Sequence, residues 1–297
     1  MLNFRKVTLE DKEQVEAYFA KSDFRGAEYN YSHLYLWSRV YPMEIAEYAG
    51  YITVYAKFDR ETYLYPAGEG DIGPMIEAME ADAKVRGIPF IIRSVTPENV
   101  EYLKTLYPDK FTYHTSPDFN DYIYLTEKLG SLAGKKLHSK RNHINRFKEN
   151  NPDWSYEKIT DQNLPEVCEM SRKWCEINGC NDDDELKKEA CAVRVALKNL
   201  EVLDLRAGLL RAGGQVIAFS IGRRINSDTF GVHVEKAFYD IQGAYPMINQ
   251  QFVQAEMEGF TYVNREEDTG DEGLRKAKQS YYPVMMVERY SAVAVEK

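Results

Sequence analysis

The strongest constraint on this chain is that its two halves carry secondary-structure signals in the same order. Each half begins with helices, followed by three β-like runs, a helix, a strand, a second helix and a last strand. The three runs read EIAEY, YITVYAKF and TYLYPAG in the first half, and LDLRAGLL, QVIAFSIGRR and TFGVHVE in the second. No sequence identity between the halves is evident. We therefore predict two α/β domains of one architecture, residues 1–127 and 128–297.

Length and composition agree with this organisation and limit the partners. A chain of 297 residues suits two cores, and 44% hydrophobic residues with 22 tyrosines supply ample surface for packing. The net charge of −9 excludes a general nucleic-acid coat, so any RNA contact requires a local basic patch. No run approaches the ~18 consecutive apolar residues of a membrane span, and the N-terminus lacks the apolar run of a signal peptide. We expect a cytoplasmic protein without an integral membrane segment.

The four cysteines are Cys168, Cys175, Cys180 and Cys191, all in one predicted helical region. Their spacings match no standard zinc pattern, so we predict no metal site. Cytosolic proteins keep their thiols reduced. We therefore expect reduced structural cysteines.

The clearest positive field lies in residues 130–151, GSLAGKKLHSKRNHINRFKENN, where one glutamate faces six basic residues: Lys135, Lys136, Lys140, Arg141, Arg146 and Lys148. On a helix, Leu137, Ile144 and Phe147 would share a packing face, while His138, Asn142 and Asn145 would project beside the basic groups. A solvated helix linking the domains is the alternative. The interleaved asparagines and histidines favour a phosphate-binding surface instead.

A second segment with candidate chemistry runs from Phe230 to Tyr245 and contains GVHVEKAFYDIQGAY. Strand alternation predicts His233 and Glu235 on one face. Glu235 and Lys236 lie at the carboxyl end of this strand, before a glycine-bearing loop and a helix, where an α/β sheet offers its ligand crevice. Pairing of both residues with other charges at the domain junction is the alternative.

The third segment, residues 262–283, reads YVNREEDTGDEGLRKAKQSYYP. Its consecutive carboxylates Glu266, Glu267 and Asp268 would repel one another if buried unpaired. They must be partly exposed or matched by the basic residues Arg265, Arg275 and Lys278. Such a network can make one carboxylate a base. Tyr281 and Tyr282 could protonate a leaving group, with core packing as the alternative.

The order of elements resembles the GCN5-related N-acetyltransferase fold in tandem, each domain being a mixed, mostly antiparallel sheet flanked by helices. The motifs KRNHINRF, VHVEKA, QGAYPMIN and NREEDTGDEGLRKAKQSYYP resemble those of the phosphatidylglycerol lysyltransferase C-terminal domain family, most clearly over residues 129–287. The resemblance implies transfer of an aminoacyl group from a charged tRNA, as in the related Fem-type aminoacyltransferases. The segment from Lys135 to Lys148 would then meet RNA phosphates. Aminoacyl-tRNA is the expected donor substrate, and no cofactor is expected.

This sequence departs from these families at two points, which bear on the donor and on the acceptor. The acetyltransferase pyrophosphate loop reads Gln or Arg, two residues, Gly, one residue, then Gly or Ala, whereas this chain has Asp240, Gly243 and Tyr245. An acidic residue opposes pyrophosphate and a tyrosine crowds the loop, so acyl-CoA is the weaker donor. The membrane-spanning domain of full lysyltransferases has no counterpart in this sequence, so the acceptor stays open.

These features lead to one mechanism and two rivals. We expect Glu235 or Asp268 to act as the base, with His233 as an optional assisting group. Lys236, Arg265 and Lys278 stabilise the charge that develops on the donor or intermediate. No covalent intermediate forms. Tyr281 is a secondary catalytic candidate. The rivals are an acetyl-CoA-dependent N-acetyltransferase and a noncatalytic tRNA-binding or regulatory protein. The predicted substrate-binding residues are Lys140, Arg141, Asn145, Arg146, Lys236, Gly243, Tyr245, Asn249, Asn264, Arg265, Glu266, Arg275 and Lys278.

The first half carries few clustered ionisable groups. We expect it to supply a wall of the cleft, with His33, Arg93 and His114 as packing or surface residues.

Overall fold

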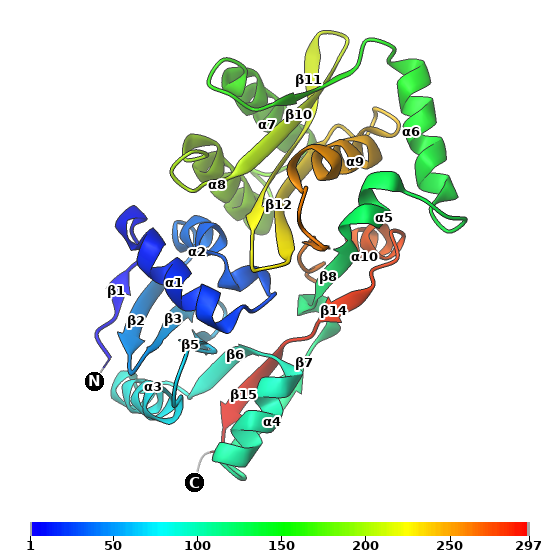
Figure 1. Ribbon diagram of the computed structural model, residues 1–297. Coiled ribbons are helices and arrows are strands. Elements are labelled where there is room, and N and C mark those ends of the chain that lie inside the picture. The colour runs from blue at the N-terminus through cyan, green and yellow to red at the C-terminus, as the bar shows by residue number, and fades with distance from the viewer. Residues whose placement is uncertain (1, 296–297) are drawn as a thin grey trace. The chain divides into compact units, whose positions relative to one another are not determined.

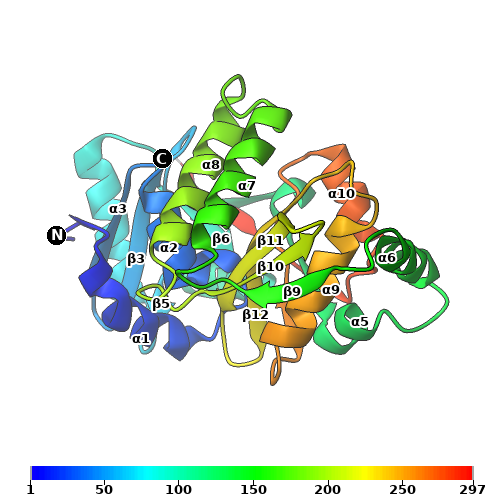
Figure 2. The same cartoon turned by 90° about the horizontal axis from the view of Figure 1, so that it is seen from above.

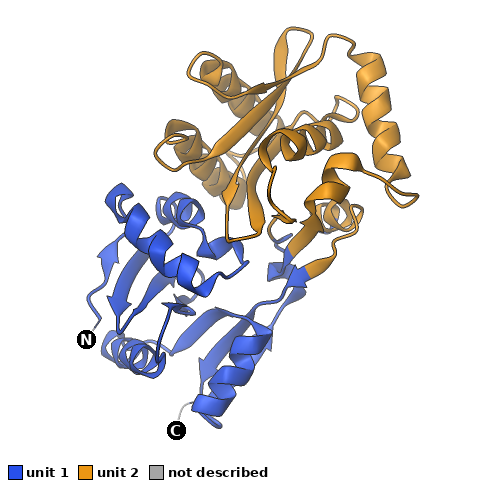
Figure 3. Ribbon diagram, viewed as in Figure 1, with its two compact units in different colours: residues 1–121, 267–272, 286–297 blue, residues 122–266, 273–285 orange. Residues whose placement is uncertain are grey.

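The computed structural model describes residues 2–295 and divides into two compact units (Figure 3). Unit 1 comprises Met1–Asp121, Glu267–Glu272 and Met286–Lys297. Unit 2 comprises Tyr122–Glu266 and Gly273–Met285. These boundaries differ from the predicted division between residues 127 and 128, because two short C-terminal segments fold with the first half of the chain.

Unit 1 is a mixed sheet with helices packed against it (Figure 1). Its strand order is β1-β2-β3-β4-β6-β15-β7, with β5 paired to β3. The strands are β1 (Arg5–Lys6), β2 (Met43–Tyr48), β3 (Tyr51–Lys57), β4 (Glu61–Leu64), β5 (Ala67–Gly68), β6 (Ile91–Val95), β7 (Phe111–Thr115) and β15 (Tyr290–Ala294). The helices are α1 (Lys12–Ser22), α2 (Tyr31–Ser38), α3 (Gly73–Arg86) and α4 (Pro97–Leu106), with short 3₁₀ turns at Leu9–Asp11, Ala27–Tyr29 and Pro117–Phe119.

Helix α3 illustrates how sequence pattern becomes packing in unit 1. Met75, Ile76 and Met79 are fully buried against the sheet, in the core that also contains Tyr63. Gly87 ends the helix in the left-handed conformation at φ +69°, where a glycine carries no Cβ penalty. Strand β6 then pairs with β4 in parallel, as a crossover helix requires.

Unit 2 repeats the architecture around the sheet β14-β8-β13-β12-β11-β10-β9. Its strands are β8 (Asp121–Leu125), β9 (Ser155–Lys158), β10 (Arg206–Ala212), β11 (Gln215–Arg224), β12 (Thr229–Ala237), β13 (Tyr262–Asn264) and β14 (Met285–Val287). Its helices are α5 (Thr126–Ser131), α6 (His138–Asn150), α7 (Leu164–Asn178), α8 (Asp184–Lys198), α9 (Ala244–Glu256) and α10 (Glu272–Gln279). Helices α7 and α8 lie on one side of the sheet, and α9 lies on the other with α5 and α6 (Figures 1 and 2).

Two predicted strands are each divided between the sheets. The β segment predicted from Phe111 to Leu125 is β7 in the sheet of unit 1 and β8 in the sheet of unit 2. The closing segment likewise divides into β14, beside β8, and β15, between β6 and β7. The sequence indicated extended backbone at both places. It did not indicate the pairing, because strand propensity does not specify the partner strand.

The expectation of reduced cysteines is wrong for one pair. Cys175 and Cys180 form a disulfide with Cα atoms 5.1 Å apart, while Cys168 and Cys191 are free. Gly179, left-handed at φ +72°, reverses the chain at the end of α7 and brings Cys180 back beside the helix. The sequence spacing of five residues did not indicate a disulfide. The two cysteines meet only because α7 ends at Asn178 and the chain reverses at Gly179.

Candidate active site

The candidate site in unit 2 is centred on Glu235, near the end of β12. Its Oε1 accepts a hydrogen bond from Arg265 Nη2 at 2.8 Å, and its Oε2 accepts one from Asn249 Nδ2 at 3.0 Å. Arg265 follows β13 and Asn249 lies on α9, so three elements converge on one carboxylate. The side chains of Glu235 and Arg265 are only 13% and 12% exposed. Three residues predicted as catalytic or substrate-binding are thus in direct contact.

The backbone of β12 explains why its side chains reach the segment after β13. Strands β12 and β13 pair in parallel from Thr229 and Tyr262 to Gly231 and Asn264. At the end of this ladder, a register shift against β11 makes His233 an extra residue, which is a β-bulge. Bulges bend a strand and redirect its side chains, and they recur beside active sites. Beyond the bulge, side chains rather than the ladder connect β12 to the segment after β13.

Two buried polar atoms of this cluster have no hydrogen-bond partner within the described residues. They are Arg265 Nη1 and Asn249 Oδ1. Buried donors and acceptors are almost always paired, because an unpaired one costs ~1–3 kcal/mol. Here one donor and one acceptor are left open beside the same carboxylate. A ligand that accepts from Arg265 and donates to Asn249 would satisfy both.

Aromatic rings and Lys140 complete the environment of Arg265. The guanidinium lies 4.9 Å from the ring centroid of Tyr281 and 5.8 Å from that of Tyr124. Lys140 Nζ, reaching in from α6, lies 4.2 Å from the Tyr281 ring centroid. Burial lowers the pKa of the Lys140 amine, and the nearby Arg265 charge lowers it further. Burial raises the pKa of Tyr281, so its hydroxyl keeps its proton at neutral pH.

Lys236 points away from this cluster, contrary to the prediction that it stabilises reaction charge together with Arg265. Its ammonium pairs with Glu189 of α8 at 2.7 Å and lies 3.7 Å from the Trp174 ring centroid. Trp174 Nε1 donates to the Ala237 carbonyl at 3.1 Å and to the Tyr245 hydroxyl at 3.3 Å. Lys236 and Tyr245 therefore belong to a packed group between α7, α8 and α9.

His233 is paired with a neighbouring carboxylate rather than with Glu235. His233 Nδ1 and Glu266 Oε1 lie 2.8 Å apart. Asn264, which is fully buried, accepts the Glu266 N–H through Oδ1 at 2.7 Å, and Glu266 adopts φ +57°. Lys278 Nζ donates to the Glu266 carbonyl at 3.1 Å. Glu266 is the centre of a second polar group, which includes the predicted residues His233, Asn264 and Lys278.

Asp268 and Arg275 belong to different units, unit 1 and unit 2. Asp268 is fully buried in the Glu267–Glu272 stretch of unit 1, where its Oδ1 accepts the Gly270 N–H at 2.9 Å. Arg275 is half-buried on α10 of unit 2. The catalytic role of Asp268 and the substrate-binding role of Arg275 stay predictions.

The basic segment forms helix α6, as expected, with Leu137, Ile144 and Phe147 buried. Asn145 and Arg146 are exposed, as a phosphate-binding surface requires. Arg141 instead donates to the Leu132 and Gly134 carbonyls, the latter at 2.8 Å, so it caps the turn after α5. Lys140 points inward to Tyr281. The sequence assigned these residues to one surface, but the structure gives them three environments. Asn145 and Arg146 face solvent, Arg141 binds the turn after α5, and Lys140 contacts Tyr281.

The loop from Asp240 to Tyr245 is packed against α6. Gly243 has φ +85°, and a Cβ placed there would lie 2.4 Å from the His143 carbonyl oxygen. This contact explains why glycine is needed at Gly243. Pro246, the third residue of α9, has no N–H to offer an anion. The start of α9 therefore presents a poor pyrophosphate cradle.

Sequence reasoning missed three residues of this region, Tyr124, Trp174 and Glu189. It also missed the contact between the Tyr281 ring and Lys140. Tyr124 donates its hydroxyl proton to the Lys278 carbonyl at 2.8 Å and contributes to the wall around Arg265. Periodicity gives no signal for these contacts, since the chain separates Tyr124 from Arg265 by more than a hundred residues.

The architecture is the fold of tandem acetyltransferase-like proteins. A tandem GNAT protein from the clavulanic acid biosynthesis pathway superposes with a TM-score of 0.52 at 10% identity, covering all of both chains. L-PGS from Bacillus licheniformis superposes at 0.64 with 15% identity, over 95% of this chain and 91% of that one. These likenesses confirm the predicted fold class.

The chain belongs to the phosphatidylglycerol lysyltransferase C-terminal family, whose model matches residues 19–293. This is a family of aminoacyltransferases. A conserved protein of unknown function from Bacteroides thetaiotaomicron is 37% identical and has a TM-score of 0.95, over 99% of this chain and 100% of that one. An uncharacterized protein of Mycoplasmoides gallisepticum is 24% identical over 67% of this chain, which spans 63% of that protein's length. Within residues 2–295, every helix is too short or too polar to traverse a bilayer.

Proposed function

We propose that this protein transfers an aminoacyl group from aminoacyl-tRNA directly to an amine or hydroxyl acceptor. The observation that carries the proposal is the Glu235 cluster with its open donor, Arg265 Nη1, and open acceptor, Asn249 Oδ1. Membership of an aminoacyltransferase family supports the class of group transferred.

An aminoacyl ester matches the open atoms in its hydrogen-bonding pattern. Its carbonyl oxygen accepts from Arg265 Nη1, and its α-ammonium group donates to Asn249 Oδ1. Negative charge grows on that carbonyl oxygen as the acceptor attacks, and a fixed guanidinium beside it stabilises the transition state. Glu235 is a positioning residue in this scheme, because both of its oxygens hold the groups that bind the donor.

Lys140 and Tyr281 move the protons. In its neutral form, which the lowered pKa favours, the Lys140 amine takes the proton of the attacking amine or hydroxyl. The Tyr281 hydroxyl protonates the departing ribose oxygen. The bond from acceptor to carbonyl carbon forms while the bond from that carbon to the ribose oxygen breaks. A proton passing from Lys140 to the Tyr281 phenolate then restores both groups. No covalent intermediate is needed.

The RNA part of the donor is assigned to the exposed face of α6. Asn145 and Arg146 are solvent-exposed, and Lys148 lies 5.3 Å from the ring centroid of Trp154. Lys136, two residues before α6, lies 5.2 Å from the ring centroid of Tyr282. Lysines and arginines at such a surface bind the RNA backbone through its phosphates. An acyl-CoA donor is less well supported, because α6 packs on Gly243 and Pro246 removes a donor.

The test follows the loss of label from radiolabelled aminoacyl-tRNAs incubated with the purified chain and a crude cell extract as acceptor source. We expect the label to be lost from tRNA charged with one particular amino acid. This loss should be abolished in the Arg265→Lys variant and retained in Arg172→Lys, which changes an exposed arginine of the same unit. Asp268→Asn, measured in parallel, shows whether that carboxylate is required.

Three results would contradict the proposal. Retained tRNA binding without any loss of label would favour the noncatalytic protein. Thiol release from acetyl-CoA in place of aminoacyl transfer would indicate an N-acetyltransferase. Full activity in Arg265→Lys would remove the Glu235 cluster from the mechanism.

A further inference from the structure

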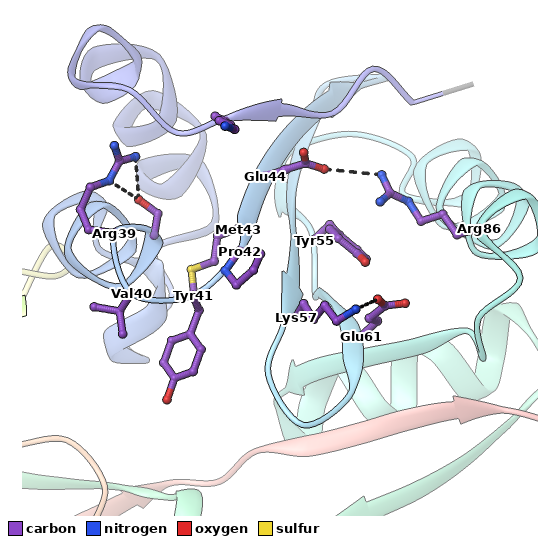
Figure 4. Close-up of a pocket in the computed structure, with 12 residues that line it drawn as sticks. Arg39, Val40, Tyr41, Pro42, Met43, Glu44, Tyr55, Lys57, Glu61 and Arg86 are labelled. Atoms are coloured by element: carbon purple, nitrogen blue, oxygen red, sulfur yellow. Dashed lines mark hydrogen bonds and ion pairs between the residues drawn. The ribbon is translucent and has the colours of Figure 1, made fainter. Parts of the chain in front are cut away.

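A groove in unit 1 lies outside the candidate active site and carries unused positive charge. Its volume is about 680 Å³, and it opens between the loop after α2 and the strands β2, β3 and β4. Figure 4 shows Arg39, Val40 and Tyr41 on one side and Tyr55, Lys57 and Arg86 on the other. Small-molecule sites typically measure ~300–1,000 Å³. The groove is therefore large enough for a metabolite.

The charges of the groove are unevenly balanced. Two of its four basic residues already have acidic partners. Lys57 pairs with Glu61 at 2.9 Å, and Arg86 pairs with Asp82 at 2.6 Å and lies 3.6 Å from Glu44. The Arg86 guanidinium also lies over the Tyr55 ring, 4.0 Å from its centroid, which helps to hold that wall in place.

The other two basic residues have no carboxylate partner within residues 2–295. Arg39 donates to neutral oxygens only, the Val7 carbonyl and the Ser38 hydroxyl at 3.0 Å. Lys6, beside Glu44 in the β1–β2 ladder, is exposed and forms no ion pair. In a chain of net charge −9, two cations without an ion pair at one groove can attract an anion.

An apolar stretch of the chain lines the groove beside these cations. Val40, Tyr41, Pro42 and Met43 line the groove consecutively, and Tyr41 packs against Phe58 with ring centroids 4.9 Å apart. An apolar and aromatic strip next to two cations that lack an ion pair suits a ligand with a flat or apolar body and a doubly charged end. A phosphomonoester carries close to two negative charges at neutral pH.

We propose that this groove binds a small phosphorylated metabolite of nucleotide size, with Lys6 and Arg39 holding its phosphomonoester and the strip 40–43 holding its body. Arginine suits the phosphate because its planar donors match phosphate oxygens, and lysine adds a point charge. The site belongs entirely to unit 1 and uses none of the groups assigned to aminoacyl transfer.

Binding is tested by titration calorimetry on the full chain at low ionic strength, with AMP, adenosine and inorganic phosphate as probes. We expect AMP to bind at least ten times more tightly than either fragment. The double variant Lys6→Ala/Arg39→Gln should weaken AMP at least tenfold, whereas Lys84→Ala, an exposed lysine of α3 in the same unit, should leave its affinity unchanged. Because no turnover is measured, failure here is distinct from failure of the proposed transferase activity.

Each other outcome overturns the proposal. Absence of AMP binding at millimolar concentration excludes the site. Equal affinity in the double variant shows that Lys6 and Arg39 do not hold the phosphate. Phosphate binding as tightly as AMP shows a free-anion site, and loss of RNA binding in the double variant without any AMP binding assigns the groove to a polyanion. Circular dichroism and urea unfolding of the double variant verify that it is folded.

Discussion

Each unit buries an arginine that pairs with a carboxylate, and the two arginines differ in how many of their nitrogens have hydrogen-bond acceptors. In unit 1, Arg289 bonds Glu28 at 2.9 Å and Asp121 at 2.6 Å, and lies 3.7 Å from Glu267. It also donates to the Phe119 carbonyl. All three of its nitrogens therefore have acceptors.

Arg265 in unit 2 is buried to the same degree, with 12% of its side chain exposed against 13% for Arg289. It has one carboxylate, Glu235, and its Nη1 has no partner within the described residues. The two side chains are equally buried, but only Arg289 has a hydrogen-bond acceptor for every nitrogen. This difference distinguishes a structural ion cluster from a ligand-binding site. Substitution of Arg289 should therefore lower the stability of the protein, and substitution of Arg265 should lower its activity.

The largest expected effect is on stability. Arg289→Met leaves Glu28, Asp121 and Glu267 without their cation, and removing one partner of a buried pair costs ~3–5 kcal/mol. We expect the free energy of unfolding in urea at pH 7 to fall by that amount. Arg172→Met, on the surface of α7, should change it by less than ~0.5 kcal/mol. A loss below ~1 kcal/mol for Arg289→Met would erase the contrast between the two arginines.

The matching change in unit 2 should act on activity. Arg265→Lys retains a charge for Glu235 but loses the second planar donor, so we expect aminoacyl transfer to drop ~10²–10³-fold. Stability should change by no more than ~1 kcal/mol, since the ion pair survives. Single-turnover label release and urea unfolding together measure both. An inactive variant that is also strongly destabilised would make Arg265 structural, like Arg289.

A smaller effect is expected from Lys140, which shares the Arg265 cluster. The Lys140 pKa is lowered by burial and by Arg265, and a base acts in its neutral form. The transfer rate should therefore rise with pH until that pKa is passed. Lys140→Arg stays cationic, so it should lose this rise and ~10²-fold in rate at the plateau. An unaltered pH profile in Lys140→Arg would assign the proton to another group.

The smallest effect concerns Glu28, on the unit 1 side of the comparison. Burial alone would raise the pKa of Glu28, but attraction to Arg289 outweighs it and lowers the pKa to about 2. A carboxyl whose folded pKa lies below its usual ~4.3 contributes stability above about pH 4, and this contribution is lost as the pH falls toward 2. We expect Glu28→Gln to cost on the order of 2 kcal/mol at pH 7 and almost nothing near pH 2.

Urea unfolding from pH 2 to 7 measures this difference, with Glu77→Gln as an exposed glutamate control in unit 1. A gap between wild type and Glu28→Gln that is constant with pH would show that packing, rather than charge, holds Glu28 in place.

Much of the candidate site could be predicted from the sequence, because its residues fall in short motifs with local signals. The strand end at Glu235, the turn containing Arg265 and the helix containing Asn249 were each identified as functional segments. Their meeting at one carboxylate was not predicted. Strand alternation also suggested a common wall for His233 and Glu235, but the β-bulge and the segment after β13 give them different partners, Glu266 and Arg265.

The sequence by itself determined the order of elements, their approximate ends and the apolar faces of α3 and α6, because periodicity, glycine and proline act over a few residues. Tertiary structure alone decided the partners of β8 and β15, the disulfide after α7 and the inward turn of Lys140. These depend on which distant segments meet. A strand or a lysine has the same local preferences whichever surface it finally faces, so only the folded chain distinguishes the alternatives.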